Sequence, residues 1–150
     1  PESVRLIAGK WRSRTLKFIA TNGLRPTGRR IRETLFNWLA PSIEGARCLD
    51  LFAGSGALCF EALSRGAKSC TALENNRPAI AQLTNNKAML NATDLDIVAT
   101  DTINFLGNNT TSSQFDVVFL DPPFDQKLHL RVAQLLTGGG WLAENALIYC

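Results

Sequence analysis

Long apolar runs and metal ligands are scarce in this 150-residue chain. No stretch approaches the roughly 18 uninterrupted apolar residues that a membrane-spanning helix needs, and the N-terminus lacks the apolar core of a secretory signal. We therefore expect a soluble cytoplasmic protein with no membrane contact, and since nothing in the sequence calls for a partner copy, a monomer.

Histidine and paired cysteines are also lacking. His129 is the only histidine, and the four cysteines, Cys48, Cys59, Cys70 and Cys150, form no CxxC pair. A structural zinc site needs several such ligands at short spacing. We expect buried thiols and no metal, with His129 on the surface rather than in catalysis.

The charge is distributed unevenly along the chain. Residues 1–47 hold ten lysines and arginines against three glutamates, a net charge of +7, whereas residues 48–150 sum to −4. A basic arm on an acidic body fits a polyanion at one end and a ligand without phosphate at the other. The candidates for contact with a nucleic-acid backbone are Arg12, Arg14, Arg29, Arg30 and Arg32. A solvated, charged hairpin face explains the same pattern about equally well.

From Arg47 onward, short apolar runs alternate with helical patterns. The pattern predicts strands over 47–52, 69–74, 96–100, 115–120 and 146–150, and helices over 57–65, 77–90, 102–107 and 127–136. This alternation is typical of a doubly wound, mostly parallel α/β sheet with helices on both faces. A ligand is then expected at the carboxyl ends of the strands, where the strand order reverses.

The first part of the chain has a different pattern. Residues 5–18 predict a two-stranded hairpin, and residues 29–39 predict an amphipathic helix that stops before Pro41, with Trp38 in the core. We interpret 1–150 as a single domain, in which 1–28 form the basic arm and 29–150 a helix plus the catalytic core. The final apolar run would leave an open sheet edge, so we expect further strands after Cys150.

A glycine turn follows the first predicted strand of the core, in the stretch Asp50-Leu-Phe-Ala-Gly-Ser-Gly56. Gly54 and Gly56 allow a sharp turn and a close approach to a ligand, and the next helix offers its unpaired N–H groups. An ordinary strand-to-helix turn explains this stretch as well. The third glycine of a dinucleotide-binding fingerprint is replaced here by Cys59.

Carboxylates follow four of the predicted strands: Asp50, Glu74, Asp101 and Asp121. Such a set would repel a pyrophosphate, but it suits a ligand with a cationic centre and hydroxyl groups, as in S-adenosylmethionine. Glu74 lies at about the interval from the glycine turn at which an acidic residue reaches a ribose. The candidate cofactor-binding residues are Asp50, Phe52, Ala53, Gly54, Ser55, Gly56, Glu74 and Asp101.

The sharpest motif is Asp121-Pro122-Pro123-Phe124, directly after an apolar strand. The Asp121 side chain and the Pro122 carbonyl can accept both hydrogens of an exocyclic base amine, and Phe124 offers a flat face for a flipped-out base. These four are the candidate catalytic residues. Methyl transfer would then depend mainly on positioning, without a nucleophilic side chain.

Several stretches resemble the bacterial small-subunit rRNA guanine-N2 methyltransferases of the RsmD type. They include Arg5-Leu-Ile-Ala-Gly-Lys-Trp-Arg, Arg32-Glu-Thr-Leu-Phe-Asn-Trp-Leu, Asp50-Leu-Phe-Ala-Gly-Ser-Gly and Asp121-Pro-Pro-Phe. The resemblance implies a Rossmann-like class I fold that uses S-adenosylmethionine to methylate one guanine of 16S rRNA, free or in an assembling small subunit. Members usually have an acid near position 29 and glycine at 13 and 59, where this chain has Arg29, Ser13 and Cys59.

Three alternatives stay open at this point. The same amine-binding motif serves adenine N6 in DNA, so a DNA methyltransferase would share the chemistry. A dinucleotide oxidoreductase is disfavoured by Cys59 and the acidic strand ends. A non-catalytic RNA-binding module would keep the fold without needing Asp121.

Overall fold

The computed structural model describes residues 2–19, 26–108, 114–121 and 126–150. Within these residues, five parallel strands form the central sheet in the order β5-β4-β3-β6-β7. The strands are β3 (Arg47–Asp50), β4 (Ser69–Glu74), β5 (Leu95–Ala99), β6 (Phe115–Phe119) and β7 (Leu142–Tyr149). The predicted doubly wound sheet is confirmed, and the order reverses between β3 and β6.

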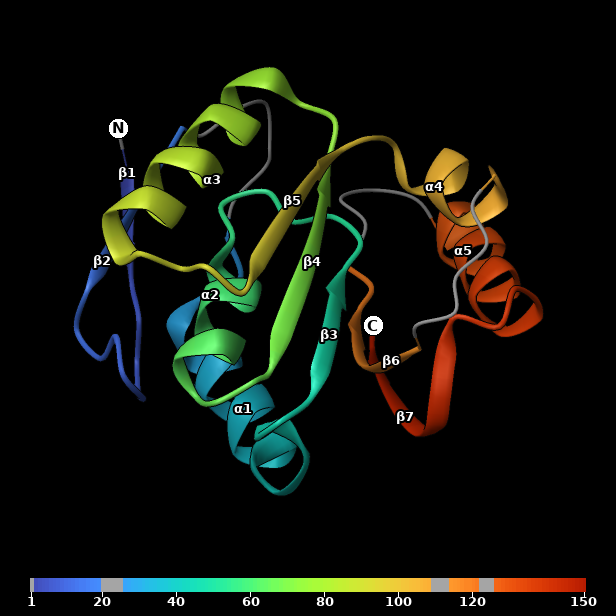
Figure 1. Cartoon of the computed structure of the whole chain (residues 1–150), viewed down its shortest axis with the longest axis horizontal. Coiled ribbons are helices and arrows are strands. Elements are labelled where there is room, and N and C mark those ends of the chain that lie inside the picture. The colour runs from blue at the N-terminus through green and yellow to red at the C-terminus, as the bar shows by residue number, and fades with distance from the viewer. Residues whose placement is uncertain (1, 20–25, 109–113, 122–125) are drawn as a thin grey trace.

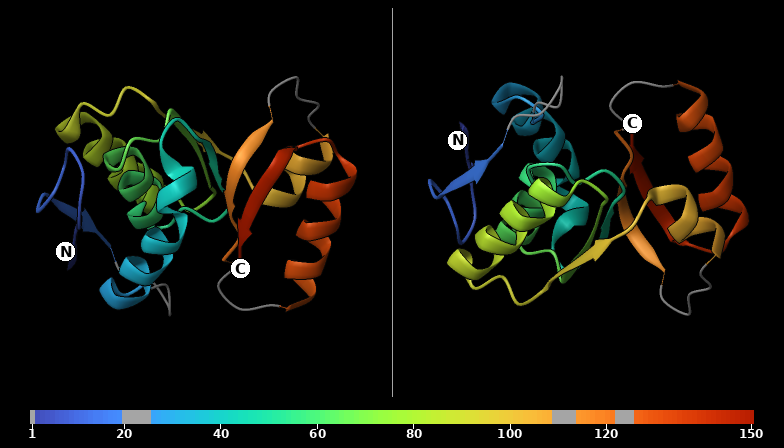
Figure 2. Two further views of the ribbon diagram at one scale, coloured as in Figure 1. Left: turned by 90° about the horizontal axis from the view of Figure 1, so that it is seen from below. Right: turned by 90° about the horizontal axis from the view of Figure 1, so that it is seen from above.

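Helices cover both faces of this sheet (Figures 1 and 2). One layer holds α1 (Arg29–Ile43), α2 (Ala57–Ser64) and α3 (Arg77–Leu90), and the other holds α4 (Thr102–Asn108) and α5 (Gln126–Gly138). Strand β6 is the apolar run Phe-Asp-Val-Val-Phe, as expected for a strand that is covered on both faces. Two separate clusters of buried apolar side chains result, one against each layer of helices.

A two-stranded antiparallel hairpin lies outside the layer of α2 and α3 (Figure 1). It consists of β1 (Glu2–Arg5) and β2 (Thr15–Phe18), with Val4 opposite Leu16. These two side chains are buried against the helices, while their neighbours along the strands face outward. The predicted hairpin is therefore present, and residues 6–14 form a long connection between its strands.

Some expectations about helix α1 were wrong. The helix does not stop before Pro41 but continues to Ile43, which is buried, so the apolar contact there favours one more turn despite the missing N–H of proline. Trp38 was expected in the core, but its side chain is exposed. Trp38 follows Leu35 by three residues, but Leu35 lies at the edge of the buried face of α1 and Trp38 lies beyond that edge, in solvent.

Smaller corrections concern the end of the chain and the thiols. Strand β7 begins at Leu142, four residues before the expected start at Ala146, and a register shift occurs opposite the segment between Phe115 and Val117. Cys48, Cys59 and Cys70 are buried thiols as expected, but Cys150 is exposed. In the described part of the chain, none of the helices is long and apolar enough to cross a membrane.

Candidate active site

The glycine turn connects strand β3 to helix α2 and is held by backbone hydrogen bonds. The N–H of Ala53 donates to the carbonyl of Leu73 on β4 at 3.0 Å, and the N–H of Gly56 donates to the carbonyl of Ala53 at 2.8 Å. The Ser55 hydroxyl accepts from the N–H of Ala57 at 3.2 Å. The turn is thus fixed at the carboxyl end of the sheet, beside the point where the strand order reverses.

The two glycines of the turn have different surroundings, although both have positive φ angles, +54° at Gly54 and +83° at Gly56. A Cβ atom at Gly56 would lie 2.6 Å from the side chain of Leu83 and 2.8 Å from that of Phe60. A Cβ at Gly54 would meet nothing within 4 Å. Gly56 therefore serves the packing of α2 against α3, whereas Gly54 leaves open space where a ligand can approach.

Asp50 ends strand β3 in a buried position with an exposed fraction of 3%. The pKa of its carboxyl is raised to about 7, mainly by burial and also by the neighbouring carboxylates of Glu74 and Asp121, against one hydrogen bond from the N–H of Phe52. No arginine or lysine of the described residues forms an ion pair with Asp50. The ends of β3, β4 and β6 thus bring three carboxyl groups close together, and within the described residues none of the three is in an ion pair with a lysine or arginine.

Glu74 connects the end of β4 to the glycine turn. One of its carboxylate oxygens accepts from the N–H of Gly54 at 2.8 Å, and the other accepts from the N–H groups of Asn75 and Asn76 at 3.1 and 2.9 Å. A carboxylate has about four lone-pair positions, so three of them are in use. Acceptance from a ribose diol through both oxygens, as the sequence predicts, would require some of these bonds to change.

Asp101 and Asp121 lie at the next strand ends. One oxygen of Asp101 accepts from the N–H groups of Ile103 and Asn104 at 2.9 and 3.3 Å, so this carboxylate caps helix α4. Among the described residues, none donates to its second oxygen. Asp121 is exposed at the end of β6. Pro122, Pro123 and Phe124, the other candidate catalytic residues, lie outside the described part of the chain.

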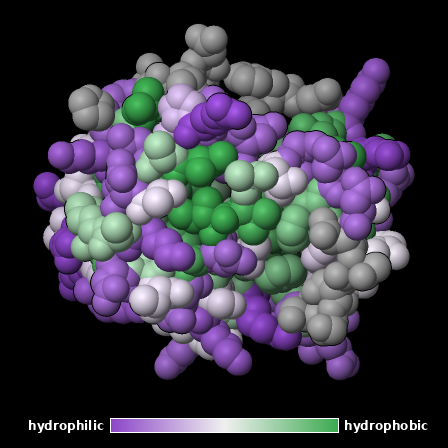
Figure 3. Space-filling model, turned by 45° about the horizontal axis from the view of Figure 1, so that its top comes forward, coloured by the Kyte–Doolittle hydropathy of each residue, from purple (hydrophilic) through white to green (hydrophobic). Residues whose placement is uncertain are grey.

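The surface at this end of the sheet combines apolar and polar groups. In Figure 3 the upper end of the molecule in Figure 1 comes toward the reader, and apolar side chains gather at its centre within a polar surround. Phe52 is half-buried beside the glycine turn and packs against the core cluster of α4 and α5. A half-buried aromatic ring beside the carboxyl groups at the strand ends suits a ligand that has both an aromatic ring and a positive charge.

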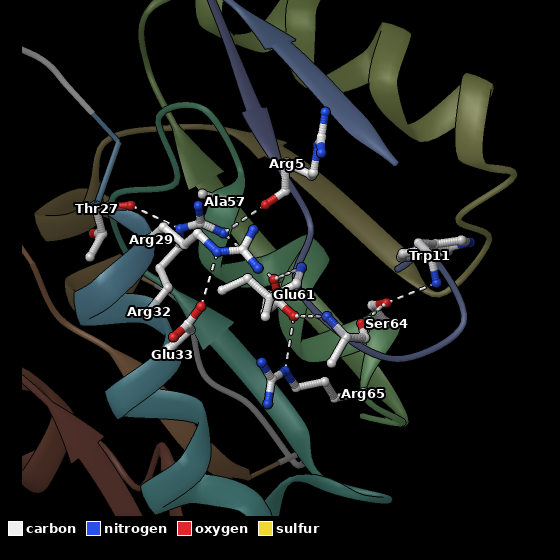
Figure 4. A network of polar contacts seen from close by, with 12 residues as sticks. Arg5, Trp11, Thr27, Arg29, Arg32, Glu33, Ala57, Glu61, Ser64 and Arg65 are labelled. Atoms are coloured by element: carbon white, nitrogen blue, oxygen red, sulfur yellow. Dashed lines mark hydrogen bonds and ion pairs between the residues drawn. The ribbon is translucent and has the colours of Figure 1, made fainter. Parts of the chain in front are cut away.

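A second buried carboxylate, Glu61 on α2, has a fully satisfied environment (Figure 4). It accepts from the N–H groups of Ile7 and Ala8 at 2.9 and 3.2 Å and from Arg65 at 2.9 Å, and it lies 3.6 Å from the guanidinium of Arg32. One turn later, Ser64 donates to the carbonyl of Ala8 and accepts from the N–H of Trp11. Helix α2 therefore holds the connection between the hairpin strands in place.

Arg32 belongs to this network and is only 2% exposed. Its guanidinium donates to the carbonyls of Thr27 and Arg5 at 2.9 and 3.1 Å. Burial lowers its pKa, although Glu61 opposes this effect. Because its donors are used inside the protein, Arg32 is removed from the set expected to contact RNA. The other four, Arg12, Arg14, Arg29 and Arg30, are exposed, and Arg29 pairs with Glu33 at 2.9 Å.

Comparison with known proteins decides the family. The model of the family described as conserved hypothetical protein 95 matches residues 4–150. Ribosomal RNA small subunit methyltransferase D of Haemophilus influenzae is 48% identical over 148 residues, which cover 97% of this chain and 77% of that protein. The protein of the same name from Escherichia coli K12 is 49% identical over 146 residues, covering 97% of this chain and 73% of that protein.

The chain belongs to this methyltransferase family. The solved structure of yhhF from Escherichia coli agrees with this, with a TM-score of 0.90 and 48% identity over 98% of this chain and 79% of that chain. The family resemblance noted from the motifs is thereby confirmed.

The structural role of Glu61 was not predicted from the sequence. Its position in an apolar helix, Ala-Leu-Cys-Phe-Glu-Ala-Leu-Ser, was the available signal, since a charged residue among buried ones needs partners. The partners come from residues 7–8 and from α1, far away along the chain. Only the folded arrangement brings them together.

Proposed function

We propose that this chain methylates the exocyclic 2-amino group of a guanine in the 16S rRNA of the small ribosomal subunit, with S-adenosylmethionine as the methyl donor. The observation that carries the proposal is the set of carboxyl groups at the ends of β3, β4 and β6 in a member of this family. The relatives' names favour rRNA over DNA, and the acidic strand ends disfavour a dinucleotide.

The cofactor site fits the chemistry of the donor. When bound, S-adenosylmethionine supplies an electrophilic methyl group on a cationic sulfur. Asp50 would place negative charge near this cation, and the open space at Gly54 would admit the ligand close to the backbone. Glu74 would hold a ribose hydroxyl with the acceptor position it has left, and Asp101 would accept a hydrogen bond with its second oxygen.

The acceptor side depends on Asp121. Its exposed carboxylate would accept one hydrogen from the guanine amine, and the Pro122 carbonyl would accept the other, so that the nitrogen lone pair points toward the methyl group. Phe124 would stack on the base. The exposed arginines Arg12, Arg14, Arg29 and Arg30 would contact phosphates of the RNA.

The test is transfer of a labelled methyl group from S-adenosylmethionine to unmodified small-subunit particles, naked 16S rRNA and DNA. We expect label in N2-methylguanine of rRNA. Asp121→Ala should lower the rate by about 100-fold, because the amine loses a positioning contact, while the cofactor Kd stays within about twofold. Asp96→Ala, which removes an exposed carboxylate on β5, is the matched control and should leave the rate unchanged.

Other outcomes would contradict the proposal in distinct ways. Label in DNA adenine alone would move the activity to the DNA alternative. An Asp121→Ala variant with the wild-type rate would remove Asp121 from catalysis, and a protein that binds RNA but transfers no label to any of the three substrates would be a binding module.

A further inference from the structure

A groove of about 430 Å³ lies between helix α1 and the end of strand β7. It is lined by Arg30, Ile31, Thr34, Leu35, Trp38 and Tyr149. Its volume lies within the range of sites that hold a small organic ligand, roughly 300–1,000 Å³. None of the described residues that line it belongs to the proposed cofactor site.

The side chain of Trp38 is the most unusual feature of this groove. It is 63% exposed, and Ile31, about two turns earlier on the same side of α1, is 54% exposed. The other two tryptophans, Trp11 and Trp141, are buried. Two large apolar side chains that face water beside a groove are typical of an interaction surface. An exposed indole is also a flat platform for stacking.

The groove lies near Asp121 of the proposed base site. Tyr149 is the last residue of β7, and its carbonyl accepts from the N–H of Leu120 at 2.7 Å, directly before Asp121. Burial raises the pKa of the Tyr149 hydroxyl, and the carboxylate of Asp121 also raises it, so the two side chains interact electrostatically. An RNA strand whose target base reaches Asp121 would therefore pass close to this groove.

The charge of the lining favours a nucleotide over an apolar polypeptide. Arg30 supplies a cation, and none of the described lining residues is a carboxylate. A guanidinium beside an exposed indole can contact a phosphate and stack a base at the same time.

We propose that this groove holds a nucleotide next to the target guanine, with its base stacked on Trp38 and its phosphate on Arg30. The proposal rests on the proposed function, because it needs single-stranded RNA at Asp121. It assigns Trp38 the role of positioning the substrate strand.

The experiment measures binding separately from turnover. A fluorescently labelled single-stranded RNA oligonucleotide is titrated with wild type, Trp38→Ala, Trp38→Phe and the control Leu130→Ala, whose side chain on α5 is also 63% exposed. Fluorescence anisotropy gives the RNA Kd, and tryptophan emission is followed with unlabelled RNA. We expect Kd to rise about tenfold in Trp38→Ala, to recover largely in Trp38→Phe and to stay unchanged in Leu130→Ala.

The tryptophan emission identifies the residue involved. Since Trp11 and Trp141 are buried, RNA should quench wild type strongly and Trp38→Phe little, although both bind. The cofactor Kd should be equal in all four proteins, and KM for rRNA should rise in Trp38→Ala with little change in kcat. Equal melting temperatures would exclude a folding defect as the cause.

Several results would overturn the groove proposal. An unchanged RNA Kd in Trp38→Ala would do so, even if wild type methylates rRNA. Loss of methylation of particles but not of naked rRNA would point to a ribosomal protein in the groove, and a dimer in sedimentation that Trp38→Ala dissolves would point to a second copy. Failure of wild type to methylate any RNA would overturn the proposed function alone, because the binding assay needs no turnover.

Discussion

Two buried carboxyl groups, Asp50 at the end of strand β3 and Glu61 on helix α2, are in opposite situations. Asp50 lies beside the glycine turn, no lysine or arginine of the described residues pairs with it, and its pKa is raised to about 7 by burial and by neighbouring carboxylates. Farther along, Glu61 is fully buried but accepts from two backbone N–H groups and pairs with Arg32 and Arg65. The two acids differ in whether the protein itself completes their surroundings.

This difference separates architecture from ligand binding. A buried charge that is neutralised by the fold stabilises one arrangement of the chain, here the attachment of residues 6–11 to α2. A buried carboxyl that the fold leaves without a cation keeps an energetic cost that a cationic ligand can offset. Asp50 is therefore the better marker of the cofactor site, although both residues are acidic and buried.

Removing the satisfied acid should have the largest effect on stability. Glu61→Ala leaves Arg32 buried without its carboxylate and two N–H groups without an acceptor, so we expect the free energy of unfolding to fall by about 3–5 kcal/mol. Urea denaturation measures this loss. Glu33→Ala, which breaks the exposed pair with Arg29, should change it by only about 0.5 kcal/mol.

If Glu61→Ala does not fold, Glu61→Gln provides the same test with a smaller loss in free energy of unfolding. The amide keeps one oxygen acceptor but carries no charge. A loss below about 1 kcal/mol in either variant would show that the network does not hold the arm, and the contrast with Asp50 would fail.

The two glycines of the turn should separate the same two roles. Gly56→Ala combines a positive φ with contacts to Leu83 and Phe60, so we expect a loss of about 3 kcal/mol in unfolding free energy. Gly54→Ala has the positive φ alone and should lose about 1 kcal/mol. Calorimetric titration with S-adenosylmethionine should show a weaker affinity in Gly54→Ala, because the added methyl group occupies the open space. Equal losses of stability in the two variants would contradict this assignment.

The fold was predictable because its signals are local. Each strand of the core is a short apolar run, and each helix has its own pattern, so β4 at 69–74 and α3 at 77–90 were predicted with their observed limits. The glycine turn and the strand-end acids were also visible, since a parallel sheet brings all carboxyl ends to one edge. Family resemblance added the identity of the chemistry.

The errors arose where distant contacts decide. Arg32 looks like an exposed arginine of a basic arm, but the carbonyl of Arg5 and the carboxylate of Glu61 draw it inside. Trp38 follows the apolar spacing of α1 and still faces water. Ser13 illustrates a subtler case: it has φ +68°, the left-handed region that favours glycine, which is the residue expected there in the family.

The pH dependence of Asp50 gives the most specific test. Its pKa is about 7 in the folded protein, against 3.8 as the ordinary value, so the folded state holds a proton that the unfolded state releases. The resulting stability is fully present below about pH 4 and is lost as pH rises through 7. Asp50→Asn cannot ionise, so its advantage in unfolding free energy over wild type should be about 2–3 kcal/mol larger at pH 8 than at pH 5.

The same substitution should weaken the ligand site while it stabilises the fold. A cationic cofactor favours ionised Asp50, so wild-type affinity for S-adenosylmethionine should rise between pH 5.5 and 8 with release of a proton, and Asp50→Asn should bind more weakly with a flatter pH profile. Calorimetry in buffers of different ionisation enthalpy measures the proton release. Asp96→Asn, an exposed acid on β5, should behave like wild type. Parallel pH profiles for wild type and Asp50→Asn would mean that Asp50 does not face the cation of the cofactor. The buried carboxyl would then lower the stability of the fold without contributing to ligand binding.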